Sequence, residues 1–389
     1  MFQSNVVEEA IIAAEERTPS PGTPSPKTRS PGTQSPGTQS PRTLESLGEF
    51  GLIEALSAWL PPAPGTLVGI GDDAAVLAAP DGRVVATTDF LIEGRHFRLD
   101  WSAAADVGHK AAARSLADVA AMGAEPSGLL VALAAPPDLP VSWLESFASG
   151  LARECARAGT AVLGGDTSRA GSVVLAVTGL GDLGGRAPVL RGGAAPGAVV
   201  AVAGPLGHAA AGLALLSAGL TPDDPDLAAL VAAQLRPAPP YDAGPEAAVL
   251  GATAMIDVSD GLLADLAHIA DASKVQIDVH TAALTDPLLT KAFQRTGGGA
   301  TSEPLPPHRP ATRTGRAGTG QTGPAAVPPE LSWALTGGED HSLVAVFPPG
   351  VPLPERWRPI GEVRPGQGVL VNGSRYQGPA GWDHFSSGG

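Results

Sequence analysis

Residues 253–272 read TAMIDVSDGLLADLAHIADA, and this stretch shows how the chain is built. An apolar run over 253–258 predicts a buried strand, and apolar residues at helical spacing predict a helix over 260–272. Asp257 stands at the strand end. Ser259 is predicted to cap the helix, with Asp260 in the first turn, where free N–H groups favour anionic oxygens. Strand, acidic motif and helix in this order indicate an α/β fold.

The alternation of strands and helices extends in both directions from this stretch. Further strands are predicted at 66–70, 74–79, 83–89, 128–134, 160–164, 172–180, 198–203, 275–279, 342–347, 357–363 and 368–371, with LSWAL at 331–335 also strand-like. Further helices are predicted at 103–121, 142–158, 208–219, 225–234 and 242–251, and over DPLLTKAFQR at 286–295. We expect two α/β layers that meet near residues 182–196. The N-terminal domain is then 44–185 and the C-terminal domain 186–389.

Two low-complexity stretches interrupt this pattern. Residues 18–43 cycle through Ser, Pro, Gly and Thr and offer no periodic apolar face. We expect residues 1–43 to form a disordered tail. A similar stretch at about 296–330 is expected to be a disordered surface insertion in the C-terminal domain.

The composition restricts the classes of function. A net charge of −14 argues against nucleic acid or an anionic membrane as partner. The chain has four lysines and no GxxxxGK[ST] loop, so a P-loop lysine cannot neutralise a bound phosphate. The single cysteine, Cys155, fits a reducing cytoplasm, and the first residues lack the basic and apolar segments of a signal peptide.

Five acidic motifs carry the chemistry. They are GIGDD at 69–73, TTD at 87–89, GGDTS at 164–168, DVSDG at 257–261 and GGED at 337–340. Asp118 adds a carboxylate in the apolar helix KAAARSLADVAAMGA. Each motif alone also fits a solvated turn or a helix cap, but together they suggest carboxylates gathered around cations. Mg²⁺ prefers such oxygen ligands and shares them with substrate phosphates. We therefore predict a magnesium-dependent phosphoryl transferase.

The motifs also resemble those of the thiamine-monophosphate kinase family. The resemblance covers about residues 44–295 and 331–386 and rests on GIGDDAAVL, TTDFLIEGRHF, SLADVAAMGAEP, GGDTSR, GRAPVLRGGAAPGA, IDVSDGLLADLAHI, LTGGEDHSL, IGEV and GWDHF. It implies an aminoimidazole ribonucleotide synthetase-like fold, in which two N-terminal sheets form the β-barrel of a homodimer. It also implies ATP-dependent phosphorylation of thiamine monophosphate to thiamine diphosphate.

The resemblance assigns roles to individual residues. It implies magnesium ligands at Asp73, Thr87, Thr88, Asp89, Asp118, Asp166, Asp257 and Asp260. It implies ATP contacts at Gly165, Asp166, Arg191 and Ser259, and thiamine-phosphate contacts at His96, Glu339 and Trp382. We expect the largest catalytic contributions from Asp89, Asp166 and Asp257.

The chain departs from the family pattern in three places, one of which is Thr87, where the family often has Ser. Ser115, Leu116, Ala117 and Asp118 stand where the family usually has Asn-Leu-Ser-Asp, and His341 stands where Tyr is common. Two alternative functions are considered. One is another ATP-dependent enzyme of the same fold, and the other is a non-catalytic protein that binds nucleotide or metal.

Overall fold

The structure is a computed structural model, and it describes residues 66–68, 75–79, 82–136, 138–220, 223–297, 327–378 and 381. The chain divides into two units between Arg42 and Thr43. All the described residues belong to the second unit. The expected tail at 1–43 and most of the expected insertion at 296–330 lie outside them.

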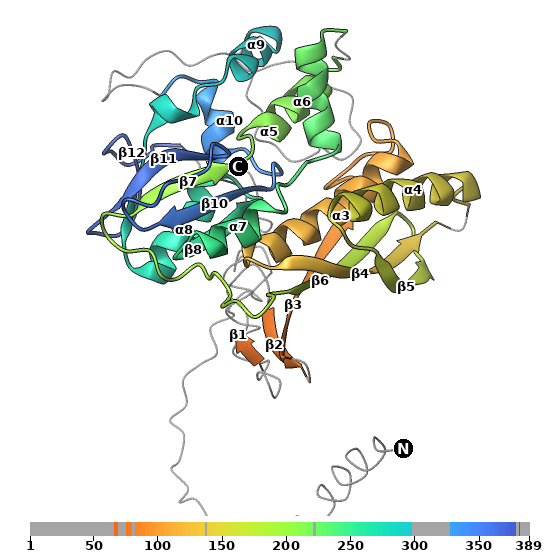
Figure 1. Ribbon diagram of the computed structural model, residues 1–389. Coiled ribbons are helices and arrows are strands. Elements are labelled where there is room, and N and C mark those ends of the chain that lie inside the picture. The colour runs from red at the N-terminus through yellow and green to blue at the C-terminus, as the bar shows by residue number, and fades with distance from the viewer. Residues whose placement is uncertain are drawn as a thin grey trace, which may run out of the picture. The chain divides into compact units, whose positions relative to one another are not determined.

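The first sheet has six strands in the order β1-β2-β3-β6-β4-β5. Its strands are β1 Thr66–Val68, β2 Ala75–Ala79, β3 Gly82–Ile92, β4 Glu125–Ala135, β5 Val162–Arg169 and β6 Val174–Asp182. All neighbouring pairs are antiparallel except β4 and β5. Two helices, α3 (Ala104–Ala121) and α4 (Val141–Arg157), pack together beside this sheet (Figure 1).

The helices α3 and α4 approach each other unusually closely because glycines lie at their contact. A Cβ atom on Gly108 would stand 2.1 Å from the carbonyl oxygen of Phe147, and one on Gly150 would stand 1.9 Å from that of Ala105. Only glycine fits at these two positions. Alanines on the buried face of α3 let it lie equally close to the sheet.

The second sheet also has six strands, in the order β12-β9-β11-β7-β10-β8. Its strands are β7 Val199–Ala203, β8 Ala254–Val258, β9 Gln276–Val279, β10 Ser342–Phe347, β11 Trp357–Arg364 and β12 Gly368–Val371. The accompanying helices are α5 His208–Ser217, α6 Pro225–Leu235, α7 Ala243–Val249, α8 Leu262–Ser273, the 3₁₀ turn η1 Thr281–Leu284, α9 Pro287–Arg295 and α10 Leu331–Thr336.

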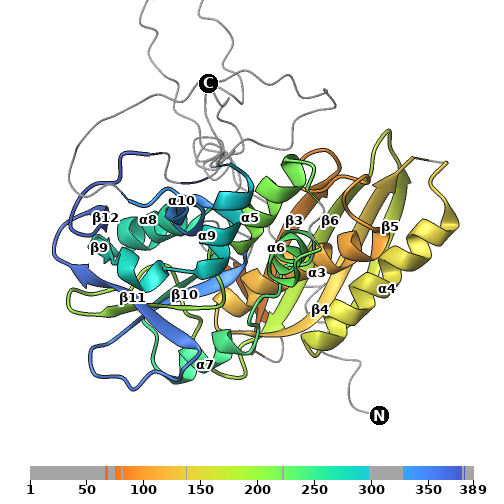
Figure 2. The same cartoon turned by 90° about the horizontal axis from the view of Figure 1, so that it is seen from above.

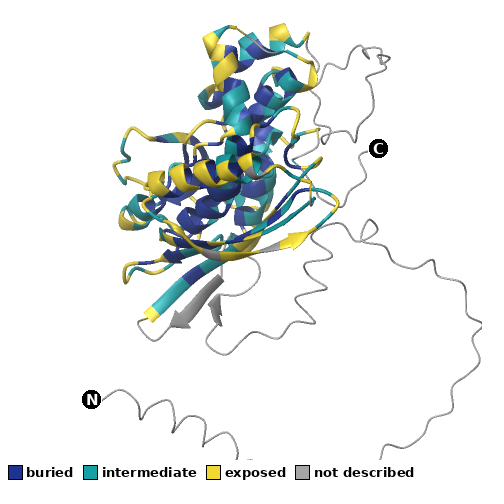
Figure 3. Cartoon of the chain, turned by 90° about the vertical axis from the view of Figure 1, so that its right-hand side faces the viewer, coloured by how far each residue is buried: buried dark blue, intermediate teal, exposed yellow. Residues whose placement is uncertain are grey.

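One apolar core joins the two sheets across α3. It contains Leu129 and Val177 from the first sheet, Leu116 from α3, and Met255 and Leu343 from the second sheet. Figure 2 shows α3 lying between the sheets, and Figure 3 shows buried residues concentrated in the interior and exposed ones on the outer helical faces. The described residues thus form a mixed α/β fold with two sheets, as expected. We propose that the two sheets correspond to the two domains predicted from the sequence.

Three local expectations are wrong. LSWAL forms the short helix α10 rather than a strand, because its leucine, tryptophan and alanine side chains bury against α5 and α8. The strands expected to end at residues 89 and 164 continue to Ile92 in β3 and Arg169 in β5, so the TTD and GGDTS motifs lie within them. The residue before α8 is Gly261 rather than Ser259, and Asp265 accepts hydrogen bonds from the backbone N–H groups of Asp260 and Gly261.

The described residues include no helix long and apolar enough to cross a membrane.

Candidate active site

The first group of predicted ligands lies between β3 and α3. Ser115 Oγ donates a 2.7 Å hydrogen bond to Asp89 Oδ2, and Thr87 Oγ1 donates one of 2.7 Å to Asp118 Oδ2. Residues 87 and 89 share one face of β3 because side chains alternate along a strand. That face points at α3. The structure therefore brings together Thr87, Asp89 and Asp118, with Ser115 as an additional partner.

Two other predicted ligands lie on the opposite face of the same sheet. Thr88 faces away from α3 and its Oγ1 accepts a 3.2 Å hydrogen bond from Thr178 Oγ1. In the strand register, Asp166 pairs with Ala132, Ala132 with Ala176, and Ala176 with Phe90. Phe90 is two residues from Thr88 along β3, so all these side chains lie on the same face of the sheet as Thr88. Asp166 is exposed on that outer face. Within one chain, Thr88 and Asp166 therefore do not join the pair of Asp89 and Asp118.

Gly165 lies beside Asp166 and faces the inside of the sheet. A Cβ atom there would stand 1.8 Å from the carbonyl oxygen of Val131 on β4. The glycine is thus required by strand packing, in addition to the ATP contact that the resemblance suggests.

In the second sheet, the DVSDG and GGED motifs run side by side. The backbone N–H of Glu339 donates to Ser259 O over 2.9 Å, and that of His341 donates to Val258 O over 2.9 Å. A Cβ atom on Gly338 would stand 2.2 Å from Ser259 O, so only glycine permits this contact. Glu339 and His341 both have left-handed backbones, with φ of 70° and 52°. The turn therefore places the Glu339 side chain next to DVSDG.

Asp257 is almost completely buried at the end of β8. Its Oδ2 lies 2.9 Å from His341 Nδ1, and both side chains are 2% exposed. His341 is thus the direct partner of a predicted ligand, at one of the positions where the chain departs from the family pattern. The Asp257 carboxylate thus faces the imidazole of His341, the residue just before β10.

Glu339 crosses from the second sheet to α3. Its two carboxylate oxygens pair with Lys110 Nζ and with Arg114 Nη1. Burial opposes ionisation of Glu339, but the two cations outweigh it and hold its pKa far below the usual range. Lys110 also donates to the backbone oxygens of His96 and Gln234, each over 3.1 Å. The ion pairs therefore join the two sheets through one helix.

His96 is buried near the same cluster. Its Nδ1 accepts a 2.9 Å hydrogen bond from the backbone N–H of Ile92, and the side chain interacts electrostatically with Glu339. The structure therefore brings together His96 and Glu339, two of the three predicted thiamine-phosphate contacts. The third, Trp382, and the predicted ligand Asp73 lie outside the described residues.

Arg114 connects the two groups of carboxylates electrostatically. Burial lowers its pKa, but the negative charges of Glu339, Asp89, Asp118 and Asp260 raise it by more. The guanidinium thus pairs with Glu339 and also interacts electrostatically with carboxylates on β3, on α3 and on the DVSDG segment. This interaction is what links Asp260, on the DVSDG segment, to Asp89 and Asp118.

Arg191 is placed elsewhere along α8. Its backbone oxygen accepts a 3.1 Å hydrogen bond from Ser273 Oγ at the C-terminal end of this helix. Burial and the positive charge of Arg191 lower the pKa of His268 in the middle of α8. The backbone of Arg191 is thus at the opposite end of α8 from Ser259.

Three residues of this site, Lys110, Arg114 and Ser115, were not among the predicted site residues. Lys110, Arg114 and Asp118 recur at intervals of four residues, so they share one face of α3. Three charged residues at this spacing in an alanine-rich helix were the available signal.

The donors of this site suit magnesium in type but form no cage by themselves. Among the described residues, no group of three or more His, Cys, Asp or Glu side chains is arranged to hold a metal ion. Carboxylate and hydroxyl oxygens are nevertheless the ligands that Mg²⁺ prefers, and in nucleotide sites one or two carboxylates suffice because phosphates complete the shell. The residues therefore fit a Mg²⁺ ion that is shared with phosphate groups.

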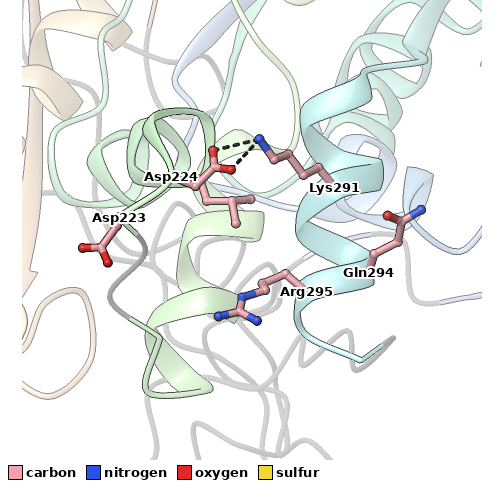
Figure 4. A pocket seen from close by; sticks show the side chains of 6 residues that line it. Asp223, Asp224, Lys291, Gln294 and Arg295 are labelled. Carbon is pink, nitrogen blue, oxygen red and sulfur yellow. Dashed lines mark hydrogen bonds and ion pairs between the residues drawn. The ribbon is translucent and has the colours of Figure 1, made fainter.

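A pocket of about 500 Å³ lies away from this site, between α6 and α9 (Figure 4). Two of its lining residues form an ion pair, with Lys291 Nζ 2.7 Å from Asp224, and Lys291 also pairs with the neighbouring Asp226 over 2.8 Å. The pocket contains none of the predicted site residues.

Comparison with known proteins first defines the class. Residues 71–183 match the family described as AIR synthase related protein, N-terminal domain. These residues include β3, α3 and the first group of carboxylates.

The particular family follows from full-length relatives. The chain is 44% identical over 346 residues to a thiamine-monophosphate kinase of Mycobacterium tuberculosis, covering 88% of this chain and 93% of the relative. It is 37% identical to that of Escherichia coli K12, covering 72% and 76%. A solved structure described as AaThiL complexed with AMPPCP and TMP superposes with a TM-score of 0.74 at 31% identity, covering 89% of this chain and all of that one. The chain belongs to the thiamine-monophosphate kinase family.

Proposed function

We propose that this chain transfers the γ-phosphoryl group of ATP to thiamine monophosphate, producing thiamine diphosphate and ADP. The supporting observation is the 44% identity to a thiamine-monophosphate kinase over 93% of its length. The gathering of Asp89, Asp118, Asp260 and Glu339 around one helix supports a site for charged substrates in this chain. Among solved structures, the similar one described as complexed with AMPPCP and TMP is in keeping with the same pair of substrates.

The acceptor in this reaction is itself a nucleophile. A phosphate monoester has a second pKa of about 6, so its oxygen is ionised at neutral pH without a general base. The protein must instead hold two mutually repelling anions in line. Magnesium, when bound, supplies positive charge between the two phosphates.

The residues of this chain then act by binding and orientation. Thr87, Asp89 and Asp118 present oxygens from one side of the site, and Asp257 and Asp260 present them from the other. We assign further metal contacts to Asp73, Thr88 and Asp166, nucleotide contacts to Gly165, Asp166, Arg191 and Ser259, and thiamine-phosphate contacts to His96, Glu339 and Trp382.

We further propose that the functional form is a homodimer built through the outer face of the first sheet, as a β-barrel. Phe90 and Leu163 are each 60% exposed there, and Leu130 is 42% exposed. Burying these side chains against a second copy would be favourable. Thr88 and Asp166 lie on the same face, so a dimer would bring them to an interface rather than leave them in solvent. We place this activity in the cytoplasm, in keeping with Cys155 as a buried free thiol.

The function is tested by following ADP release with three acceptors. Thiamine monophosphate is expected to support turnover with formation of thiamine diphosphate, while thiamine and water are not. Turnover with thiamine alone, or ADP release without an organic acceptor, would favour another ATP-dependent enzyme of this fold. Nucleotide binding without any turnover would favour a non-catalytic protein.

The dimer is tested separately by light scattering. Phe90→Asp places a charge in the centre of the exposed face and is expected to shift the protein from dimer to monomer. Val249→Asp is the matched control, since Val249 is 74% exposed on α7, outside this face. A wild-type protein that is monomeric at micromolar concentration would contradict the proposal.

A further inference from the structure

Arg114 occupies a position that a simple ion pair does not explain. Its Nη1 donates to Glu339, and its side chain is only 12% exposed. Among the described residues, its buried Nε has no hydrogen-bond partner. Glu339 already has a second cation, Lys110, whose side chain is 3% exposed. One carboxylate needs one cation, so a second buried cation requires a further reason.

The reason lies in the surrounding charge. Arg114 pairs with Glu339 and interacts electrostatically with Asp89, Asp118 and Asp260. Asp118 lies one turn further along the same face of α3, and Asp89 accepts a hydrogen bond from Ser115, the residue that follows Arg114. Lys110 lies one turn before Arg114 on the same helix face, and His96 lies beside Glu339. Four carboxylates against Lys110 and Arg114 leave two negative charges in the cluster. Without Arg114 there would be three.

We propose that Arg114 is a resident counter-ion of the carboxylate cluster, which keeps bare divalent ions weakly bound so that magnesium enters together with the nucleotide. The proposal rests on the function given above, because it takes Asp89, Asp118 and Asp260 as metal ligands. A guanidinium among these ligands offsets part of the charge that a divalent ion would otherwise meet, and it repels the ion directly. Nucleotide phosphates bring their own negative charge and oxygen ligands, so they restore the attraction. Arg114 is thus a positioning residue that acts through the carboxylates.

Among the described residues, no three His, Cys, Asp or Glu side chains are arranged to hold a metal ion, which agrees with this role. The carboxylates are held by Ser115, Thr87, Lys110 and Arg114 rather than turned toward one common point. A cluster partly neutralised by its own cations can fold without metal, whereas four carboxylates with no cation would repel one another more strongly.

The test measures Mn²⁺ binding by electron paramagnetic resonance, with and without the non-hydrolysable nucleotide AMPPCP. Arg114→Gln is expected to bind Mn²⁺ alone about tenfold more tightly than the wild type. Arg114→Lys keeps the charge and is expected to bind Mn²⁺ like the wild type. Arg157→Gln is the matched control, because Arg157 also pairs with a buried glutamate, Glu154, on a different helix. With AMPPCP present, the difference between Arg114→Gln and the wild type is expected to shrink.

Three outcomes would overturn the proposal. Unchanged or weaker Mn²⁺ binding by Arg114→Gln would show that the guanidinium does not oppose the metal. Unchanged Mn²⁺ binding with weaker metal-free AMPPCP binding would make Arg114 a phosphate contact instead. Equal gains in Arg114→Gln and Arg157→Gln would show a general charge effect.

Two further points keep the test decisive. If Arg114→Gln does not fold, Arg114→Met keeps the apolar stem without the charge, and the same result is expected from it. The Mn²⁺ measurement needs no acceptor, so its result is separate from whether thiamine monophosphate is phosphorylated.

Discussion

The carboxylates of the first sheet and those of the second are held by different kinds of partner. Asp89 and Asp118 accept hydrogen bonds from the neutral hydroxyls of Ser115 and Thr87. In the second sheet, Glu339 pairs with two cations and Asp257 with His341. A hydroxyl hydrogen bond contributes about 1 kcal/mol, whereas breaking a buried ion pair costs about 3 kcal/mol or more. The first pair can therefore exchange its partners for a metal ion at low cost, while Glu339, held by two cations, mainly fixes the geometry.

Asp89→Asn is expected to have the largest effect. The variant keeps the hydrogen bond from Ser115 but removes the negative charge, so turnover with ATP and thiamine monophosphate should fall about 10³-fold, or about 4 kcal/mol of barrier. The melting temperature should stay within a few degrees of the wild type. Steady-state kinetics and thermal melts measure both. Asp271→Asn, an exposed residue of α8, is the matched control and should retain full activity. Near-normal turnover of Asp89→Asn would remove Asp89 from the metal ligands.

Glu339→Gln is expected to act on stability more than Asp89→Asn does. It leaves Lys110 and Arg114 buried without their shared carboxylate, which should cost about 3 kcal/mol of unfolding free energy. Urea unfolding measures this loss. Glu362→Gln breaks the exposed pair with Arg364 and should change the free energy by less than about 1 kcal/mol. Equal losses in the two variants would mean that the buried pair is no stronger than a surface pair.

Asp340 should give the second sheet a pH dependence of its own. Burial raises its pKa from 3.8 to about 6, against the hydrogen bonds that it accepts from the N–H groups of Ala209 and Gly207. Because the folded pKa is the higher one, protonation favours the folded state. This contribution is fully present below pH 3.8 and is lost as the pH rises through about 6.

The expected size is roughly 2 kcal/mol between about pH 4.5 and about pH 6.5. The contribution of Glu339 to stability has the opposite sign. Because its pKa is lowered in the folded state, its ionisation stabilises the fold above pH 4.5, and this stabilisation is lost as the pH falls below that value. Urea unfolding of wild type and Asp340→Asn across this range isolates Asp340. The wild type should lose stability relative to the variant as the pH rises. Parallel curves for the two proteins would contradict the raised pKa.

Ser115→Ala is expected to have the smallest effect. Its Oγ lies 2.7 Å from Asp89 Oδ2 and 3.1 Å from Val177 O, so losing it should cost about 1 kcal/mol of stability and raise the magnesium requirement a few-fold. Magnesium titration of turnover measures the latter. Ser332→Ala removes an exposed hydroxyl bonded to Pro329 O and serves as control. A loss as large as that of Asp89→Asn would give Ser115 a direct role in the reaction.

Much of the fold could be predicted because local patterns determine it. The helix expected at 103–121 is α3 at Ala104–Ala121, and the strand expected at 342–347 is β10 with the same bounds. LSWAL was mistaken for a strand because five residues cannot distinguish a buried strand from a buried helix turn. Contacts of this segment with α5 and α8, which are distant in sequence, decide that it forms a helix.

The site could be predicted only in part, for a similar reason. The motifs and their helix context identified Asp89 and Asp118. The face of the sheet on which a residue lies depends on the strand register, however, and the register places Asp166 on the opposite face from Asp89. Arg114 was missed because its significance comes from Glu339, which is 225 residues away in sequence. Long-range pairing of this kind leaves no local pattern.

The helix α3 is a single rigid element that contacts both sheets. Each residue of a helix turns the chain by about 100°, so one inserted or deleted residue between Lys110 and Asp118 would rotate half of the charged face away from its partners. Substitutions can accumulate on the exposed positions of this helix, but its length between Lys110 and Asp118 cannot change without uncoupling the carboxylates of one sheet from the turn of the other.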